Sequence, residues 1–421
     1  MKRTERTDVE RARLSRRAVL GGAGALTALG VGARAAASLP RRAAQRPVLV
    51  QVFLRGAMDG LTTVVPHGDG DYYAARPTLA VPPPGAASGA RDLDGFFGLA
   101  PAAAPLLTPY RNGHLAIVHA CGSTDPTRSH FDAFARMELG DPNQPPGRVS
   151  DGWIARTLAS LAPLGGPLRA LGAGYVLPLS LAGADAALPI ADPAHFSFPG
   201  RFESAAWRAA LLDETYASRG GLVGEAALRS LDSIAELASV DFAGHVPANG
   251  AQYPSGDLGA RLRGAATLIQ ARVGIEAITV DVDGWDLHAA EGPLDGAMAA
   301  LLDELTRALE AFYLDLLGSL DDYVLVCLSE FGRRVAENAS GGTDHGHGNA
   351  LFVLGGGVNG GRVFAHWPGL APVALDGEDL AVTTDYRDVL GEILARRLGV
   401  GPAGLAAIFP QHAFSAVGVM A

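Results

Sequence analysis

The sequence predicts an α/β protein with a doubly wound, mostly parallel sheet and helices on both faces. Two observations lead to this prediction. Five short runs are almost continuously apolar, which is typical of strands that are covered on both faces. Between them lie longer segments with the three- and four-residue apolar spacing of helices. Strand and helix patterns therefore follow one another along the chain, as they do in doubly wound folds.

The five predicted strands are short runs rich in valine, leucine and isoleucine. The first of them stops at Arg55-Gly56, which ends its apolar pattern. The runs cover residues 47–54, 114–120, 275–280, 323–328 and 350–354.

The clearest helix is predicted over residues 293–317. Its apolar residues recur every three or four positions, Pro293 suits the first turn and Gly318 suits the end. Residues 258–273 and 387–398 are predicted to form further helices.

Two other segments complete one predicted domain over residues 47–421. Residues 66–107 are rich in proline, glycine and alanine, and we expect them to form surface loops. Residues 165–253 show helical patterns with weak strand signals, which predicts a helical insertion in the α/β domain.

The first 37 residues differ from the rest of the chain. A basic start is followed by residues 18–33, which carry no charge, and Ala35-Ala36-Ala37 fits a cleavage site. Arg16-Arg17 lie in SRRAVL, which resembles a twin-arginine signal. The alternative, a membrane anchor, needs about 20 apolar residues, more than this run offers. We predict a signal peptide over residues 1–37, a linker over residues 38–46, and export by the twin-arginine machinery to the periplasm or beyond, without stable membrane insertion after cleavage.

The charge of the chain argues against two classes of partner. Beyond residue 37 the sequence has 26 Lys and Arg against 41 Asp and Glu, a formal charge of −15, and it has no basic cluster. Nucleic acid and anionic membranes are therefore poor partners. A negative surface can still surround a site in which metal ions reverse the local field.

The chain has two cysteines, Cys121 and Cys327, and each ends a predicted strand. In an exported protein they could form a disulfide. They could also be two small buried apolar side chains, which is the interpretation that we favour.

Acids and histidines cluster where the predicted strands end. Ligands of open α/β sheets bind beyond the carboxyl ends of the strands, so these side chains are candidates for a shared site. In strand order the candidates are Asp59; Ser129 and His130; Asp283, Asp286 and His288; Glu330 and Arg333; and, before the fifth strand, Asp344, His345 and His347.

These residue types favour a divalent metal. Carboxylates and neutral imidazoles are good ligands for Zn²⁺ or Mn²⁺. Asp286 and His288 are two positions apart, so on an extended loop both can face one ion. Glycines around Asp344 and His345 let the backbone turn sharply and bring both side chains inward. A single Asp-His pair can also be a solvated turn, but the number of strand-end acids favours one or two bound ions.

Six motifs in a fixed order resemble a known family. They are LRGAMDGLTTVVP, RSHFDAF, DGWDLHA, SEFGRR, GGTDHGHGNALFVLGGGVNGGRV and TTDYRDVL. They look like the exported bacterial family catalogued as domain of unknown function 1501, over residues 47 to about 410. That family is regarded as similar to the alkaline phosphatase and sulfatase superfamily. The resemblance implies an alkaline-phosphatase-like fold and a metal-dependent hydrolase of small-molecule phosphate or sulfate esters.

The resemblance also implies a role for each candidate residue. Ser129 resembles the nucleophile, and Arg128, Arg333 or His130 would hold the non-bridging oxygens of the ester. The residues that resemble metal ligands are Asp59, Asp283 or Asp286, His288, Glu330, Asp344, His345 and His347.

Two departures from the superfamily pattern keep a second function open. Phe331 stands where the superfamily has a histidine, and the spacing around Trp285 is not the usual one. The alternative to a hydrolase is therefore an exported binding or assembly protein that keeps the fold with a degenerate metal site.

Overall fold

The computed structural model describes residues 46–142 and 150–421. The predicted signal peptide and all of the predicted linker except Arg46 lie outside the described residues. Within them, none of the helices is long and apolar enough to cross a membrane.

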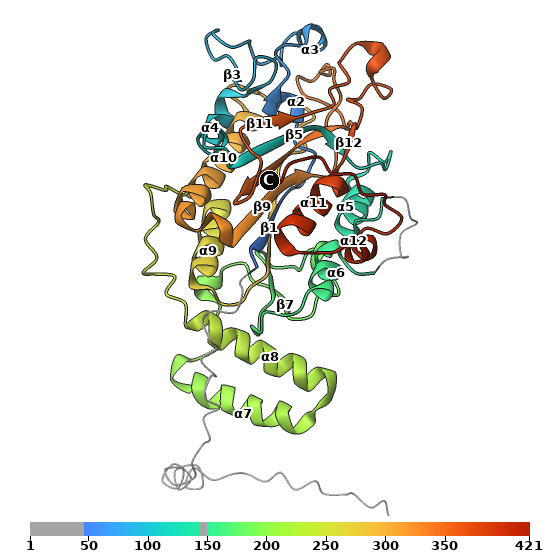
Figure 1. Ribbon diagram of the computed structural model, residues 1–421. Coiled ribbons are helices and arrows are strands. Elements are labelled where there is room, and N and C mark those ends of the chain that lie inside the picture. Colours follow the sequence, from blue (N-terminus) through green and yellow to red (C-terminus); the bar gives the residue numbers. More distant parts are fainter. Residues whose placement is uncertain (1–45, 143–149) are drawn as a thin grey trace, which may run out of the picture. The chain divides into compact units, whose positions relative to one another are not determined.

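A nine-stranded sheet forms the centre of the described chain (Figure 1). Its strands follow the order β11-β5-β10-β9-β1-β8-β6-β7, and β12 also pairs with β5. The strands are β1 (Val48–Leu54), β5 (Leu115–Gly122), β6 (Ala170–Gly172), β7 (Ala187–Pro189), β8 (Ala277–Val282), β9 (Tyr323–Ser329), β10 (Asn349–Gly355), β11 (Arg362–Phe364) and β12 (Thr384–Asp385).

The predicted fold class is confirmed, and all five predicted strands are present. Every pair of neighbours is parallel except the two that involve β10, which runs antiparallel to both β5 and β9. Since β10 runs the other way, it begins at the edge of the sheet where β1, β5, β8 and β9 end. The segment before β10 therefore meets the segments that follow the other four strands.

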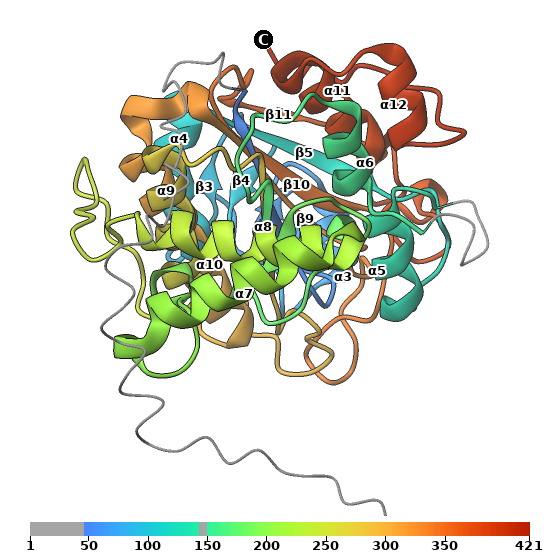
Figure 2. The same ribbon diagram turned by 90° about the horizontal axis from the view of Figure 1, so that it is seen from below.

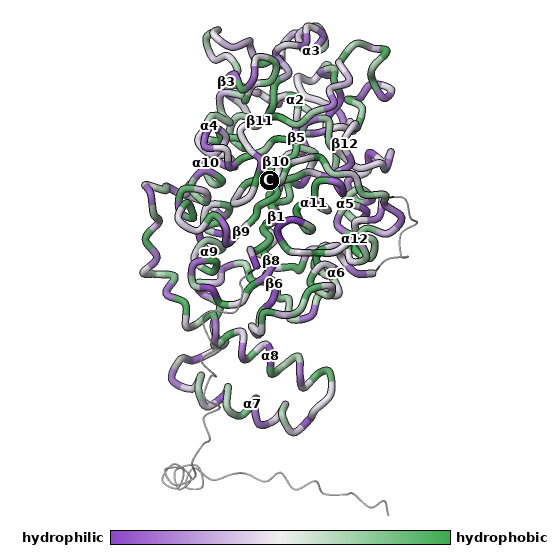
Figure 3. The backbone as a smooth tube through the Cα atoms, viewed as in Figure 1, coloured by the Kyte–Doolittle hydropathy of each residue, from purple (hydrophilic) through white to green (hydrophobic). Residues whose placement is uncertain are grey.

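Helices cover both faces of the sheet and enclose two hydrophobic cores. One face packs against α9 (Asp257–Ala271) and α10 (Ala297–Asp315), with Leu262, Leu305 and Phe312 fully or almost fully buried. The other face packs against helices that supply Trp153, Tyr386 and Ile408 to the second core. These helices are α5 (His130–Leu139), α6 (Trp153–Ser160), α11 (Tyr386–Leu398) and α12 (Pro402–Ile408). The strands between the two helix layers are largely apolar (Figure 3), as their continuous apolar runs predict.

The prediction of surface loops over residues 66–107 is wrong in part. This segment contains the helix α3 (Gly70–Ala75), and the helix α4 (Leu107–Arg111) begins at its end. It also supplies two strands of a small sheet, β3 (Arg91–Asp92) and β4 (Gly98–Leu99). The third strand, β2 (Val64–Val65), comes just before the segment and follows the helix α2 (Gly60–Thr63). Tyr72, Val81 and Leu99 are buried in the first core. Their apolar side chains are separated by proline and glycine turns, so they leave no periodic pattern in the sequence.

Two helices in the middle of the chain form a hairpin. They are α7 (Ala205–Arg219) and α8 (Gly221–Ala238), which pack against each other at the bottom of Figure 1 and in the foreground of Figure 2. No described residue of α7 is buried, whereas α8 buries Ser233 and Leu237. That this segment is an insertion stays a prediction.

The two cysteines are free and buried. Cys121 belongs to the core on one face of the sheet and Cys327 to the core on the other face. The sheet separates the two thiols, so the preferred interpretation of two small buried side chains holds.

Candidate metal centre

Three histidines and one aspartate from three strand ends meet at the carboxyl edge of the sheet. The Oδ1 atom of Asp286 lies 3.3 Å from Nε2 of His130, 2.9 Å from Nε2 of His288 and 3.1 Å from Nε2 of His345. His130 begins α5, Asp286 and His288 follow β8, and His345 precedes β10. The antiparallel direction of β10 thus brings His345 to the residues that follow parallel strands.

Glycines allow the strand-end loops to approach one another closely. A Cβ atom on Gly56, after β1, would lie 2.6 Å from the backbone nitrogen of Asp286, and the φ of Gly56 is +115°. A Cβ atom on Gly342 would lie 2.4 Å from the carbonyl carbon of His288. Both distances are shorter than real contacts, so only glycine fits at these two positions.

The other ring nitrogen of each histidine is held by an acceptor. Nδ1 of His130 lies 2.6 Å from Oε1 of Glu330, and Nδ1 of His288 lies 3.2 Å from Oδ1 of Asp344. Nδ1 of His345 lies 2.8 Å from the carbonyl oxygen of Arg128, which can only accept. In a neutral imidazole with the proton on Nδ1, the lone pair is on Nε2. All three rings then turn an Nε2 lone pair toward the same carboxylate oxygen.

This arrangement fits a divalent cation. The Nε2 atoms of His288 and His345 lie only 2.9 Å apart, and Nε2 of His130 is buried without a hydrogen-bond partner. Lone pairs that face each other at this distance need a cation or a proton between them. Histidine ligands of metals typically donate their second N–H to a carboxylate or carbonyl, as these three do.

The nitrogen and oxygen donors suit Zn²⁺ or a similar ion. Among the described residues, one group of at least three potential ligands has all its ligand atoms within 4.8 Å of one another, namely His130, Asp286 and His345. His288 lies beside this group through its contacts with Asp286 and His345. Asp286 and His288 keep 46% and 43% of their side chains exposed, so the centre is open to small molecules.

The charge states of the ligands favour metal binding. Partial burial would raise the pKa of Asp286, but the hydrogen bond from Arg333 and the positive charge of its guanidinium oppose this effect, and the pKa lies below the ordinary value. Burial lowers the pKa of His345, which favours the neutral ring. The hydrogen bond to Glu330 raises the pKa of His130, so a metal ion must compete with a proton there.

Arg333 lies beside this cluster, but its guanidinium is already occupied. It donates to the carbonyl oxygens of Gly56, Ala57, Trp285 and Thr343 and, at 2.7 Å, to Oδ1 of Asp286. Its side chain is 1% exposed. This contradicts the expectation that Arg333 holds ester oxygens, because its donors face inward. These hydrogen bonds join the loops after β1 and β8 to the loop before β10.

Asp59 does not reach the cluster, in contrast to the expectation that it is a metal ligand. It caps the short helix α2, and its carboxylate pairs with the buried guanidinium of Arg76. The Asp59 side chain is buried, whereas Asp286 of the cluster is partly exposed.

The remaining candidates take three kinds of position. Glu330 and Asp344 bind the Nδ1 atoms of His130 and His288, on the side of each ring that faces away from Asp286. His347 contacts Asp376 and the carbonyl of Ser123, and the exposed Asp283 has no described contact with the cluster.

Ser129 is the N-cap residue of α5, directly before His130. Within the described residues its hydroxyl makes no hydrogen bond, and no side chain caps the N-terminus of α5. The serine directly precedes a histidine of the cluster in the chain, and its hydroxyl is not used to cap the helix.

The sequence did not reveal the contacts of three residues: Asn338 and Arg128 support the site, and Arg76 holds Asp59 away from it. Asn338 donates to the carbonyl oxygen of His288 and to Oδ1 of Asp344, Arg128 offers its carbonyl to His345, and Arg76 binds Asp59. An asparagine among glycines and serines signals only a turn, and a backbone carbonyl has no signal in the sequence at all.

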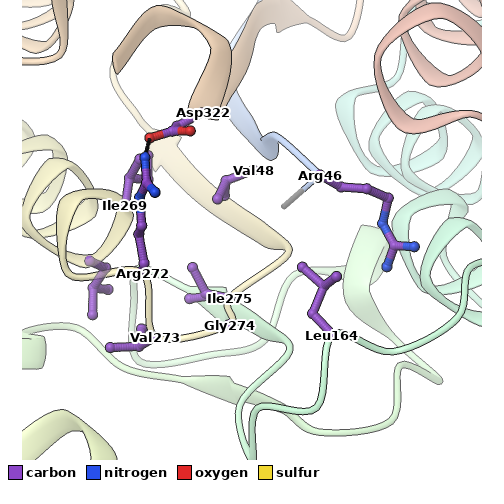
Figure 4. Close-up of a pocket in the computed structure, with 10 residues that line it drawn as sticks. Arg46, Val48, Leu164, Ile269, Arg272, Val273, Gly274, Ile275 and Asp322 are labelled. Carbon is purple, nitrogen blue, oxygen red and sulfur yellow. Dashed lines mark hydrogen bonds and ion pairs between the residues drawn. The ribbon is translucent and has the colours of Figure 1, made fainter. Parts of the chain in front are cut away.

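A small pocket at the opposite edge of the sheet is separate from this centre. It lies at the amino ends of β1, β8 and β9, and the Arg272–Asp322 ion pair is part of its lining (Figure 4). None of the candidate metal ligands lines it.

The fold and the site together define an α/β protein with a candidate metal centre at the carboxyl edge of its sheet. The chain belongs to the family described as "Protein of unknown function (DUF1501)", whose model matches residues 46–395. No curated protein matches the sequence.

Similar solved structures include Ps i-CgsB in complex with k-i-k-neocarrahexaose, at 12% identity and a TM-score of 0.34, which covers 76% of this chain and 69% of that chain. Another is the PsFucS1 sulfatase from Pseudoalteromonas sp., at 12% identity and a TM-score of 0.35, with 76% of this chain and 64% of that chain covered.

Proposed function

We propose that the protein is a metal-dependent hydrolase of phosphate or sulfate esters. The observation that carries the proposal is the shared orientation of three imidazoles, whose Nε2 atoms face Asp286 Oδ1 while acceptors hold their Nδ1 atoms. His130, Asp286, His288 and His345 would hold the ion. A divalent cation supplies Lewis-acid stabilisation of the oxygens of the reacting ester.

We assign the role of nucleophile to Ser129. Its hydroxyl would form a bond to phosphorus or sulfur, the bond from that atom to the alcohol oxygen would break, and the alcohol would leave with the hydroxyl proton. Water would then cleave the serine ester and restore the hydroxyl. The uncapped N-terminus of α5 supports this role, since its free N–H groups and the helix dipole favour an anionic ester group beside Ser129.

The test is turnover of phosphate monoesters, phosphate diesters and sulfate esters with Zn²⁺ or Mn²⁺ added. Ser129→Ala is expected to abolish turnover and leave the metal content unchanged, whereas Asp286→Asn is expected to remove both. Ser239→Ala, at the end of the distant α8, is the matched control and should retain both. Unchanged turnover by Ser129→Ala would exclude the serine as nucleophile.

The alternative is a non-catalytic binding protein, and one observation favours it. Arg333, which would hold an ester oxygen in the hydrolase, is committed to four carbonyls and Asp286. If the wild-type chain binds metal through Asp286 but turns over none of the esters, the binding protein is the correct interpretation.

We also propose that the chain is exported by the twin-arginine machinery, on the basis of the first 37 residues. Replacing Arg16 and Arg17 by lysine is expected to keep the protein in the cytoplasm with its signal uncleaved. Cell fractionation would show this, and normal export of the variant would contradict it.

A further inference from the structure

The first-strand carboxylate that the resemblance assigns to a metal ion, Asp59, already has all its partners inside this protein. Here Oδ1 of Asp59 accepts from the backbone nitrogens of Leu61 and Thr62 at 3.0 and 3.2 Å, and Oδ2 accepts from the Thr62 hydroxyl at 3.0 Å and from Arg76. Both oxygens of this buried carboxylate are thus in use.

Arg76 is fixed in its position by more than Asp59. Its Nε donates to the carbonyl oxygen of Val335 at 2.8 Å, and its Nη2 donates to that of Arg334 at 2.9 Å. The side chain is completely buried. A metal ion at Asp59 would have to displace the guanidinium and leave a buried cation without its partner, which is a large cost.

The charges of this buried cluster balance without an ion. Glu291 is the second carboxylate and is fully buried; it accepts from the Thr343 hydroxyl at 3.0 Å and lies 3.4 Å from the Thr62 hydroxyl oxygen, which donates to Asp59. Burial and the nearby Asp59 carboxylate raise the pKa of Glu291, which favours its protonated form. One guanidinium, one carboxylate and one carboxylic acid are then neutral together.

The cluster also lacks the donors of a metal site. No histidine joins Asp59 and Glu291 in a group with metal-ligand spacing among residues 46–142 and 150–421, where the only such group is that of His130, Asp286 and His345. An ion at Asp59 would therefore find few ligands, and it would have to displace the guanidinium of Arg76.

We infer that the protein binds a single divalent ion, because the guanidinium of Arg76 permanently occupies the position of a second cation beside Asp59. The inference rests on the proposed metal centre. The strand-end residues of the sequence are compatible with one or two ions; with Arg76 in place of a second ion, charge on the substrate would be neutralised by one ion and by protein groups.

Metal stoichiometry tests the inference directly. The mature chain is stripped with a chelator, dialysed against a series of free Zn²⁺ or Mn²⁺ concentrations, and analysed for metal and protein. We expect a plateau of one ion per chain for the wild type, one for Asp59→Asn and none for Asp286→Asn. A plateau of two in the wild type that falls to one in Asp59→Asn would overturn the inference and leave the proposed function standing. A plateau of zero in the wild type would overturn both.

A gain-of-binding variant provides an independent readout. Arg76→Met leaves Asp59 and Glu291 facing each other without a cation. The thermal midpoint of this variant is therefore expected to keep rising with divalent ion concentration after the metal centre at Asp286 is saturated. The double variant Asp59→Asn, Arg76→Met should show no such rise. An equal rise in the wild type would contradict the inference. If Arg76→Met does not fold, the comparison of the wild type with Asp59→Asn still decides.

Discussion

At the scale of single residues, the site depends on which nitrogen of each imidazole carries the proton. Glu330, Asp344 and the carbonyl of Arg128 fix the three Nδ1 atoms, and the Nε2 atoms are thereby left to a shared ligand position. The acids predicted as ligands thus divide into Asp286, which faces the centre, and Glu330 and Asp344, which orient histidines.

Glu330→Gln tests the orienting role. We expect metal affinity to fall about 10- to 100-fold, because the amide holds the Nδ1 proton of His130 less well than the carboxylate does. Competition with a chromogenic chelator measures the affinity. Glu392→Gln is the control, since Glu392 is also buried and accepts backbone N–H groups, but near the C-terminus. Equal affinities of the wild type and Glu330→Gln would contradict the assignment.

Glu291→Gln tests the charge state of the buried cluster. Burial and the Asp59 carboxylate raise the pKa of Glu291 to about 8, above its unfolded value of about 4.3. Between these two pH values the folded chain binds more protons than the unfolded chain, so its stability falls as pH rises. Glutamine does not titrate, so this variant should gain on the wild type by up to about 1.4 kcal/mol per pH unit within this window and no further above it. Urea unfolding at several pH values measures this, and a constant difference would contradict it.

At the scale of elements, the direction of β10 decides whether the site can form. An apolar run such as residues 350–354 reveals a buried strand but not its direction. Asp344 and His345 reach the carboxyl edge only because β10 is antiparallel to β5 and β9.

The long strands and helices were predictable because their apolar patterns extend over five residues or more. The strands β6, β7, β11 and β12 have only two or three residues, too few for a pattern. The role of Asp59 was not predictable, because it depends on Arg76, which the fold places beside it from a segment without strong periodicity. What the sequence could supply was the set of residues near the strand ends, and what it could not supply was their partners.

Arg333→Met tests how the strand-end loops are held together. Removing the guanidinium leaves four carbonyl oxygens without their donor, and an unsatisfied buried acceptor typically costs about 1–3 kcal/mol. We expect a loss of this size in unfolding free energy together with weaker metal binding. Arg307→Met is the control, because its exposed pair with Asp303 should contribute less than about 1 kcal/mol. Similar losses in both variants would contradict the positioning role.

At the scale of the whole molecule, one sheet separates two hydrophobic cores, and the candidate metal ligands lie at its carboxyl edge. The core residues of each face alternate along β1, so Val50 and Val52 pack on one face while Leu49 and Phe53 pack on the other. Neither core depends on a covalent cross-link.

Stability is therefore expected to be independent of thiol redox state. Cys121 and Cys327 lie in different cores, so the thermal midpoint should be the same with and without reductant. Alkylation of the denatured, unreduced protein should modify two thiols per chain. A midpoint that falls on reduction, or fewer than two modified thiols, would show a disulfide that the structure does not contain.

The account as a whole requires that the carboxyl edge of the sheet binds a divalent metal. The most direct measurement is an anomalous difference map from a crystal soaked with Zn²⁺. It should show one strong peak about 2.0–2.2 Å from Nε2 of His130 and of His345 and from Oδ1 of Asp286, with His288 adjoining. A map without a peak there, or with its strongest peak at Asp59, would contradict the account.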